Sequence, residues 1–228
     1  MLSTIAIIPS APVLVPELAG AAADEVAELR AAMVAAVAAL PPRWIVVGVG
    51  ATDAVFGPQS VGTFAGFGAD LAVRLSPEAS GPPVELPPCA LIAGWMRDQA
   101  QPDARAEVHV FAANHDAEAA LARGRQLRDE VEQPTGPTGV LVITDGANTL
   151  TPAAPGGYHP ADIDIQRALD DALGCGDVAA LTRLPEQVMG RVAFGVLAGL
   201  AEPAPRSAKE LHRAAPYGVG YFAGVWQP

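Results

Sequence analysis

Side chains that could do chemistry gather in one stretch, which begins at Thr144 and reads TDGANTLTPAAPGGYHPADID. Asp145, Asn148, His159 and Asp162 lie within it. Carboxylates and an imidazole this close in sequence are groups that bind a divalent metal, and the same groups transfer protons in acid–base catalysis. Asp162 also suits a structural role as an acid at the start of a helix, where a carboxylate complements the helix dipole. Both interpretations stay open at this point.

Two further candidates lie after apolar runs elsewhere in the chain. Ser10 could act as a nucleophile, although the sequence identifies no base to activate it. Asp53 ends the run GVGATD, which lacks the later glycine of a dinucleotide-binding turn. His115, followed by Asp116, is typical of a turn with a helix cap. The chain has no GxSxG, P-loop or HExxH motif, so the catalytic classes that depend on them are not expected.

The elements that must position these residues alternate between strands and helices. Apolar runs predict strands at residues 3–8, 44–49, 108–111, 140–144 and 218–225. A weaker run predicts a further strand at 71–75. Helical spacing of apolar residues predicts helices at 21–40, 90–101, 117–131, 161–173 and within 184–200. The segment 202–217 is expected to be irregular, with a short helical piece around 209–213. This order predicts one α/β domain over residues 1–228, with a largely parallel central sheet flanked by helices.

Ligands of such sheets bind beyond the carboxyl ends of the strands. Three segments leave predicted strands at such ends, namely residues 9–17, 50–58 and 144–160. The run APYGVGY near the C-terminus could close the same pocket. The fold class therefore predicts that Ser10, Asp53 and the stretch after Thr144 converge on one edge of the sheet.

Four runs of sequence stand out when they are taken together. They are IPSAPVLVPE at 8–17, WIVVGVGATD at 44–53, TDGANTLTPAAPGGYHP at 144–160, and HRAAPYGVGY at 212–221. A weaker run, GTFAGFGADLAV, lies at 62–73. In this order they resemble the class III (LigB-type) extradiol ring-cleavage dioxygenases. The resemblance extends from residue 8 to residue 221 and implies a LigB-like α/β fold.

The chemistry of that family implies a nonhaem Fe(II) held by two histidines and a glutamate, with a further histidine as acid–base. The first ligand position falls on Ser10, and the second on Ala51, or on Gly50 if the alignment shifts by one. The glutamate falls on Ala214 and the acid–base histidine on Asn148. Alanine and glycine offer no side-chain donor, and a neutral serine is a poor iron ligand. The resemblance therefore implies a LigB-type homologue that has lost its Fe(II) ligands, and no cofactor is expected.

We expect such a chain to lack ring-cleavage activity, and either to bind a small aromatic molecule or to serve as a partner subunit. The residues expected to contact a ligand are Ser10, Asp53, Asp145, Asn148, Tyr158 and His159. One alternative is a metal-dependent oxidoreductase or dioxygenase with a relocated site at Asp53, Asp145, His159 and Asp162. A second alternative is a metal-free hydrolase that uses Ser10.

The composition of the chain excludes some classes of binding partner and favours one cellular compartment. The net charge of −11 argues against nucleic acid, because phosphate binding needs clustered lysine and arginine. Cys89 and Cys175 lie far apart without a CxxC or Cys/His neighbourhood, so a zinc site is not expected and a reducing compartment is favoured. No apolar run approaches the roughly 20 residues that span a bilayer. We expect a cytoplasmic protein without a membrane partner, and a homo-oligomer, since half of the residues are hydrophobic.

Overall fold

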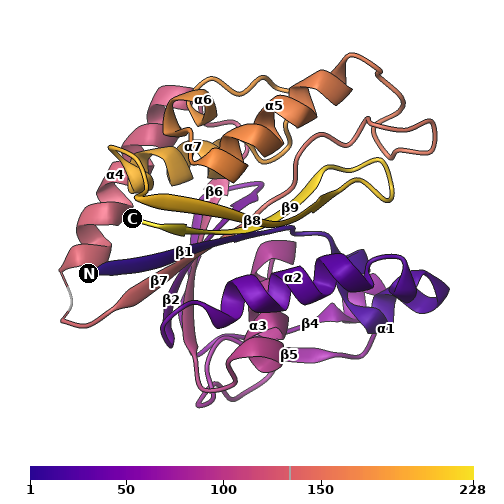
Figure 1. Ribbon diagram of the computed structural model, residues 1–228. Coiled ribbons are helices and arrows are strands. Elements are labelled where there is room, and N and C mark those ends of the chain that lie inside the picture. The colour runs from indigo at the N-terminus through magenta and orange to yellow at the C-terminus, as the bar shows by residue number, and fades with distance from the viewer. Residues whose placement is uncertain (134) are drawn as a thin grey trace.

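The structure, a computed structural model, describes residues 1–133 and 135–228, with residues 21 and 22 as backbone alone. Its centre is a seven-stranded sheet in the order β3-β6-β2-β7-β1-β9-β8 (Figure 1). These strands are β1 Leu2–Ile8, β2 Arg43–Gly50, β3 Ala54–Phe56, β6 Arg105–Ala112, β7 Thr138–Ile143, β8 Ser207–Ala214 and β9 Tyr221–Gln227. The adjacent strands β6, β2, β7 and β1 are parallel. The predicted α/β class with a largely parallel sheet is therefore confirmed.

Helices cover both faces of the sheet (Figure 1). One face carries α2 Ala27–Ala38 and α3 Pro88–Ala100, and the other carries α4 Ala117–Glu132, α5 Asp162–Cys175, α6 Val178–Leu181 and α7 Arg191–Ala201. Alternate side chains of β1 belong to different cores, with Ile5 and Ile7 on one side and Ala6 and Ile8 on the other. This period of two follows from the pleat of a strand. Because both faces of these strands are buried, their sequences are continuous apolar runs.

A second, two-stranded sheet lies beside α3. Its strands β4 Val61–Thr63 and β5 Ala72–Arg74 pair in antiparallel fashion and are joined through the 3-10 helix Phe64–Phe67. The weak strand predicted at 71–75 therefore exists, but it pairs outside the central sheet. The strands β3 and β4 were not predicted, because three residues are too few to show a period.

The prediction for residues 202–217 is wrong. The segment forms the edge strand β8, which pairs with β9 along its length. Its sequence SAKELHRA contains good helix formers, but pairing with β9 overrides local propensity. Charged residues such as Lys209 and Arg213 suit an edge strand, because they discourage pairing with another chain. Since β9 is antiparallel to β1 and β8 is antiparallel to β9, β8 runs in the direction of β1, and Ala214 lies at the carboxyl edge.

The helix predicted at 21–40 is shorter than expected. The chain first forms a single turn, α1 Pro16–Ala19, and a 3-10 helix, Gly20–Asp24, before α2 begins at Ala27. Gly20 has a positive φ of 53° and separates the two short pieces, while Val26 lies outside the helical region. An alanine-rich run favours helix everywhere and gives no start signal, so the sequence misplaced the beginning. Within the described residues, no helix has both the length and the apolar character needed to cross a membrane.

Candidate functional site

The candidate site is the edge of the sheet where β1, β2, β6, β7 and β8 end. Ser10 follows β1, Ala51 follows β2, Thr144 follows β7, and Ala214 ends β8. In Figure 1 the long loop after β7 and the turn between β8 and β9 extend from the same side of the sheet, near α1. The N- and C-termini lie at the opposite edge of the sheet (Figure 1). The structure therefore brings the predicted segments to one edge.

Asp145 and Ser10 form the most enclosed polar contact at this edge. Asp145 is 6% exposed. Its Oδ1 accepts a hydrogen bond from the backbone N–H of Ser10 at 2.9 Å, and its Oδ2 accepts one from the Ser10 hydroxyl at 2.7 Å. Burial raises the pKa of Asp145, and the two bonds from Ser10 oppose that rise. The pair ties the segment after β1 to the segment after β7.

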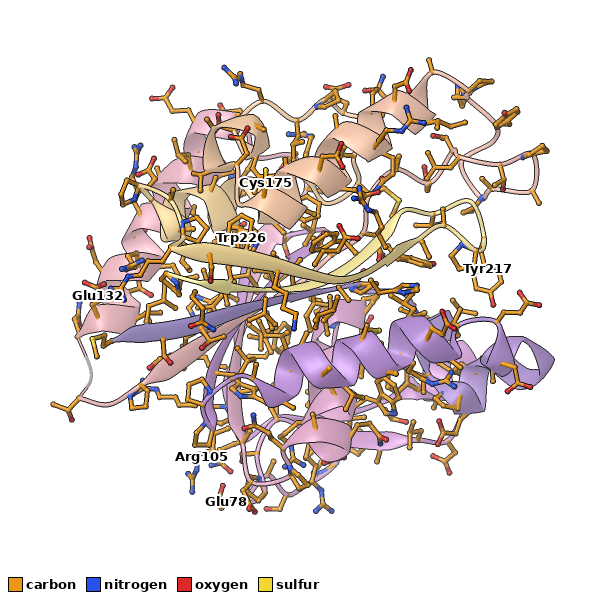
Figure 2. The ribbon with its side chains drawn as sticks, viewed as in Figure 1. Glu78, Arg105, Glu132, Cys175, Tyr217 and Trp226 are labelled. Atoms are coloured by element: carbon orange, nitrogen blue, oxygen red, sulfur yellow. The ribbon has the colours of Figure 1, made fainter. Side chains whose placement is uncertain are left out.

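Tyrosines of the C-terminal segment lie near this pair. Burial, followed by the charge of Asp145, raises the pKa of Tyr221, so its phenol stays neutral. Tyr217 extends from the β8–β9 turn at the same edge (Figure 2). Burial, together with the charge of Glu25 and a hydrogen bond with it, raises the pKa of Tyr217. The APYGVGY segment thus reaches from Asp145 to Glu25, just before the start of α2.

The beginning of the stretch after β7 is bonded to the C-terminal run PYGVGY. Gly146 N–H donates to the Gly220 carbonyl at 2.8 Å, and Gly220 N–H donates to the Ala147 carbonyl at 2.8 Å. Leu150 N–H donates to the Gly218 carbonyl at 3.0 Å. TDGANTL and PYGVGY therefore form one backbone unit, although about 70 residues of chain separate them.

Gln166 of α5 explains why two of these positions are glycine. Its buried side chain accepts a hydrogen bond from Ala147 N–H at 2.8 Å. A Cβ on Gly146, or on Gly220, would lie 2.1 Å from an atom of the Gln166 side chain. The glycines therefore serve close approach, which is a structural requirement and carries no catalytic implication.

The residues at the far end of the stretch have local partners. Asn148 packs against Gly156, where a Cβ would lie 2.4 Å from Asn148 Oδ1. Asp162 lies in the first turn of α5 and accepts a hydrogen bond from the Thr149 hydroxyl at 2.5 Å, which agrees with its structural interpretation. His159 and Tyr158 are exposed on the loop. The loop is thus held by its own contacts.

Asp53 belongs to a separate cluster at the end of β2. Its Oδ1 accepts hydrogen bonds from Ala112 N–H and from His115 Nε2, both at 2.7 Å, and Arg123 lies 3.5 Å from Oδ2. The Ala112 bond first, and then His115, lower the pKa of Asp53. Asp116 caps α4 as predicted, but the contact of its neighbour His115 was missed. The signal available was the position of His115, just beyond the carboxyl end of β6.

The relocated metal site is not assembled. Asp145 pairs with Ser10, Asp53 with His115, and Asp162 with Thr149, while His159 lies on an exposed loop. Across residues 1–133 and 135–228, no three side chains of His, Cys, Asp or Glu are grouped so that they could hold a metal ion. The four predicted residues share an edge of the sheet and do not form one site.

Fe(II) does not fit the positions that the resemblance assigns to its ligands. Ser10 uses both its hydroxyl and its N–H on Asp145. Ala51 and Ala214 carry no donor atoms in their side chains. A facial triad of two imidazoles and a carboxylate cannot form from these residues.

Ala51 and Ala214 instead line two pockets. The Ala51 pocket has a volume of about 740 Å³, and Phe56, Phe67, Val84, Leu86 and Leu91 contribute to its mainly apolar wall. The Ala214 pocket has a volume of about 570 Å³ and lies among α5, the loop after β7 and the end of β8. Both volumes fall in the range of small-molecule sites, which is about 300–1,000 Å³.

Comparison with known proteins gives the fold and no more. No family model matches the chain, and no curated protein matches it. A solved structure of an uncharacterized protein from Escherichia coli K12 is similar with a TM-score of 0.58, over 98% of this chain and 99% of that chain. The identity is 9%, so the likeness concerns the fold alone.

Proposed function

We propose that this chain is a LigB-type homologue that does not perform iron-dependent ring cleavage and that binds a small aromatic molecule in the Ala51 pocket. The observation that carries the proposal is the pocket itself. A ligand-sized hollow remains at the edge of the sheet where this class of fold binds ligands, while Ser10, Ala51 and Ala214 offer iron no adequate set of donors. A pocket that is kept while the Fe(II) ligands are absent favours the binding of a ligand over its oxidation.

The wall of the Ala51 pocket favours an aromatic ligand. Phe67 is 46% exposed and lines the pocket. Its ring packs edge to face on the buried Phe64, with the ring centroids 6.1 Å apart, which holds it in place. An exposed, positioned ring offers a stacking surface to a second aromatic ring. Glu85 is the one charged side chain on the wall among the described residues, so an uncharged ring is favoured over an anionic ligand.

Titration calorimetry with catechol tests the proposed binding. The exposed Ala51 points to a matched pair of variants, Ala51→Trp and Ala214→Trp, which fill different pockets. Catechol is expected to bind the wild type and Ala214→Trp equally, and Ala51→Trp at least about tenfold more weakly. Equal binding to all three proteins, or no binding to the wild type, would overturn the Ala51 pocket as the site.

Metal analysis tests the loss of ring cleavage. Protein purified without chelator is expected to contain far less than one iron per chain and to leave catechol uncleaved after incubation with Fe(II). Stoichiometric iron together with ring-cleavage activity would contradict the proposal.

The contact between Ser10 and Asp145 supports a second candidate, a metal-free hydrolase. Ser10 Oγ lies 2.7 Å from a carboxylate whose burial raises its pKa, which supplies the base that the sequence left unidentified. A screen of simple esters with the wild type and Ser10→Ala decides between the two. Equal rates for both proteins would eliminate Ser10 as a nucleophile.

We also propose that the chain is cytoplasmic and associates with itself or with a partner subunit. The edge strand β3 supports association, because Val55 is 61% exposed on it. Light scattering is expected to give a multiple of the monomer mass of 23.3 kDa. A monomer mass would refute self-association and leave the partner-subunit role to be tested by co-purification.

A further inference from the structure

The Ala214 pocket differs from the Ala51 pocket in the character of its walls. Its apolar wall is formed by Leu150, Ala214 and Ala215, together with Ile163 of α5. The same helix contributes Gln166 and Asp170, which are one helical turn apart. A ligand in this pocket would therefore contact both apolar carbon and polar groups.

Charges around the Ala214 pocket are unequal. Arg167 is bonded to Asp164 at 2.6 Å, and Arg213 is bonded to Asp171 at 2.7 Å and to Glu210 at 3.0 Å. Both arginines are thus already paired with carboxylates. Asp170 and Asp171 line the pocket with the two arginines, while Asp164 and Glu210 are bonded to those arginines from outside the lining. Four acids therefore accompany two arginines, so the neighbourhood is negative and favours a cation.

Asp170 has a carboxylate oxygen available to such a cation. Its Oδ1 accepts a hydrogen bond from Gln166 Nε2 at 2.8 Å. Among the residues that the structure describes, no hydrogen bond or ion pair reaches its Oδ2. Burial raises the pKa of Asp170 to about 6, against the opposing effects of Gln166 and Arg213, while Glu210 and Asp171 add to the rise. A ligand that brings a positive charge would stabilise the ionised carboxylate.

We propose that the Ala214 pocket binds a small organic ammonium ion, which donates to Asp170 Oδ2 and packs its hydrocarbon body on the apolar wall. This inference goes beyond the proposed function, because it concerns a second pocket and a different class of ligand. It depends neither on the resemblance nor on an aromatic ring.

Cyclohexylamine and cyclohexanol form a matched pair of probes for calorimetry at about pH 7.5, since an alkyl amine keeps its proton there. They have the same body, differ in charge, and lack the ring that favours the Ala51 pocket. The proteins are the wild type, Asp170→Asn, Ala214→Trp and, as a control, Ala51→Trp. Asparagine keeps a carbonyl that can accept from Gln166, so Asp170→Asn is expected to fold.

The wild type is expected to bind the amine at least about tenfold more tightly than the alcohol, as a charged hydrogen bond allows. Asp170→Asn should remove that preference, Ala214→Trp should lose binding, and Ala51→Trp should retain it. Binding of the amine should weaken at about pH 5, where the Asp170 carboxyl becomes protonated. Equal binding of amine and alcohol, an unchanged preference in Asp170→Asn, or loss only in Ala51→Trp would each overturn the proposal. A failure of catechol to bind would not affect it.

Discussion

Asp145 and Asp53 follow the adjacent parallel strands β7 and β2, yet they differ in burial and in the charge of their partners. Asp145 is 6% exposed and is bonded to a neutral residue, Ser10. The side chain of Asp53 is 42% exposed and contacts His115 and Arg123. Burial raises the pKa of Asp145, whereas the bond from Ala112 N–H and the contact with His115 lower that of Asp53.

The difference shows that a position at the edge of the sheet does not decide the role of a residue. Asp145 joins the segments after β1 and β7 inside the protein, where a lost partner leaves a polar group without water. Asp53 lies at the surface, where water replaces lost partners at small cost. We therefore expect changes around Asp145 to alter the stability of the fold, and changes around Asp53 to have little effect on it.

The largest effect is expected from Asp145→Ala. The substitution leaves the backbone N–H and the hydroxyl of Ser10 without their acceptor, and opens a small cavity beside it. Loss of the acceptor for these half-buried donors costs about 1–2 kcal/mol, and the cavity adds to it, so we expect a loss of about 2–3 kcal/mol in the free energy of unfolding. Urea denaturation measures this loss.

Asp53→Ala is the matched control for that experiment. It also removes a carboxylate after a strand of the same sheet, but that side chain is 42% exposed, so water can take its place beside His115 and Arg123. A loss below about 1 kcal/mol is expected. If both variants lose the same stability, the contrast between the two aspartates is wrong.

Ser10→Ala should have the next largest effect. It removes the hydroxyl bond to Asp145 Oδ2 and keeps the backbone bond to Oδ1. One hydrogen bond to a buried carboxylate corresponds to about 1–2 kcal/mol in the free energy of unfolding. Measured by urea denaturation, a loss equal to that of Asp145→Ala would mean that the hydroxyl carries the whole contact. No loss would mean that the backbone bond carries it.

The sequence predicted the edge correctly and its surroundings incompletely. Apolar runs identified β1, β2 and β7, and the rule for parallel sheets then placed Ser10, Asp53 and Asp145 at their carboxyl ends. The partners of these residues could not be predicted. The contact of Ser10 with Asp145 spans 135 residues, and that of Asp53 with His115 spans 62, and no local pattern specifies either.

The C-terminal part illustrates a different limit. The polar run SAKELHRA favours a helix by itself, and only its pairing with β9 makes it β8. The position of Ala214 at the edge depends on that pairing, so the pocket that it lines was not predictable. Gln166 was missed for a related reason, because its place between Gly146 and Gly220 arises from the contact of two distant runs.

The dependence of stability on pH offers a finer comparison, through Asp145→Asn and Asp53→Asn. The folded pKa of Asp145 is raised above its ordinary value of 3.8, so the pH-dependent part of its contribution to stability is full below that value and is lost as the pH rises through the folded pKa. The folded pKa of Asp53 is lowered, so its contribution is present above 3.8 and is lost as the pH falls through the folded pKa.

Urea denaturation at several pH values should therefore give opposite slopes. The stability of the wild type relative to Asp145→Asn should fall as the pH rises above 3.8, and relative to Asp53→Asn it should fall as the pH decreases below 3.8. The change for Asp53 should be the smaller one, because solvent screens an exposed group. Slopes of the same sign would show that one of the two environments is misassigned.

Arg123→Ala should give the smallest effect. Its guanidinium lies 3.5 Å from Asp53 Oδ2, and both side chains are more than 40% exposed. An exposed pair of this kind contributes about 0–0.5 kcal/mol, so urea denaturation should barely distinguish the variant from the wild type, and added salt should remove any remaining difference. His115→Ala gives the sharper comparison, since it removes a contact of 2.7 Å to the same carboxylate. If Arg123→Ala destabilised the protein more than His115→Ala did, the arginine would be holding α4 against the sheet through more than its charge.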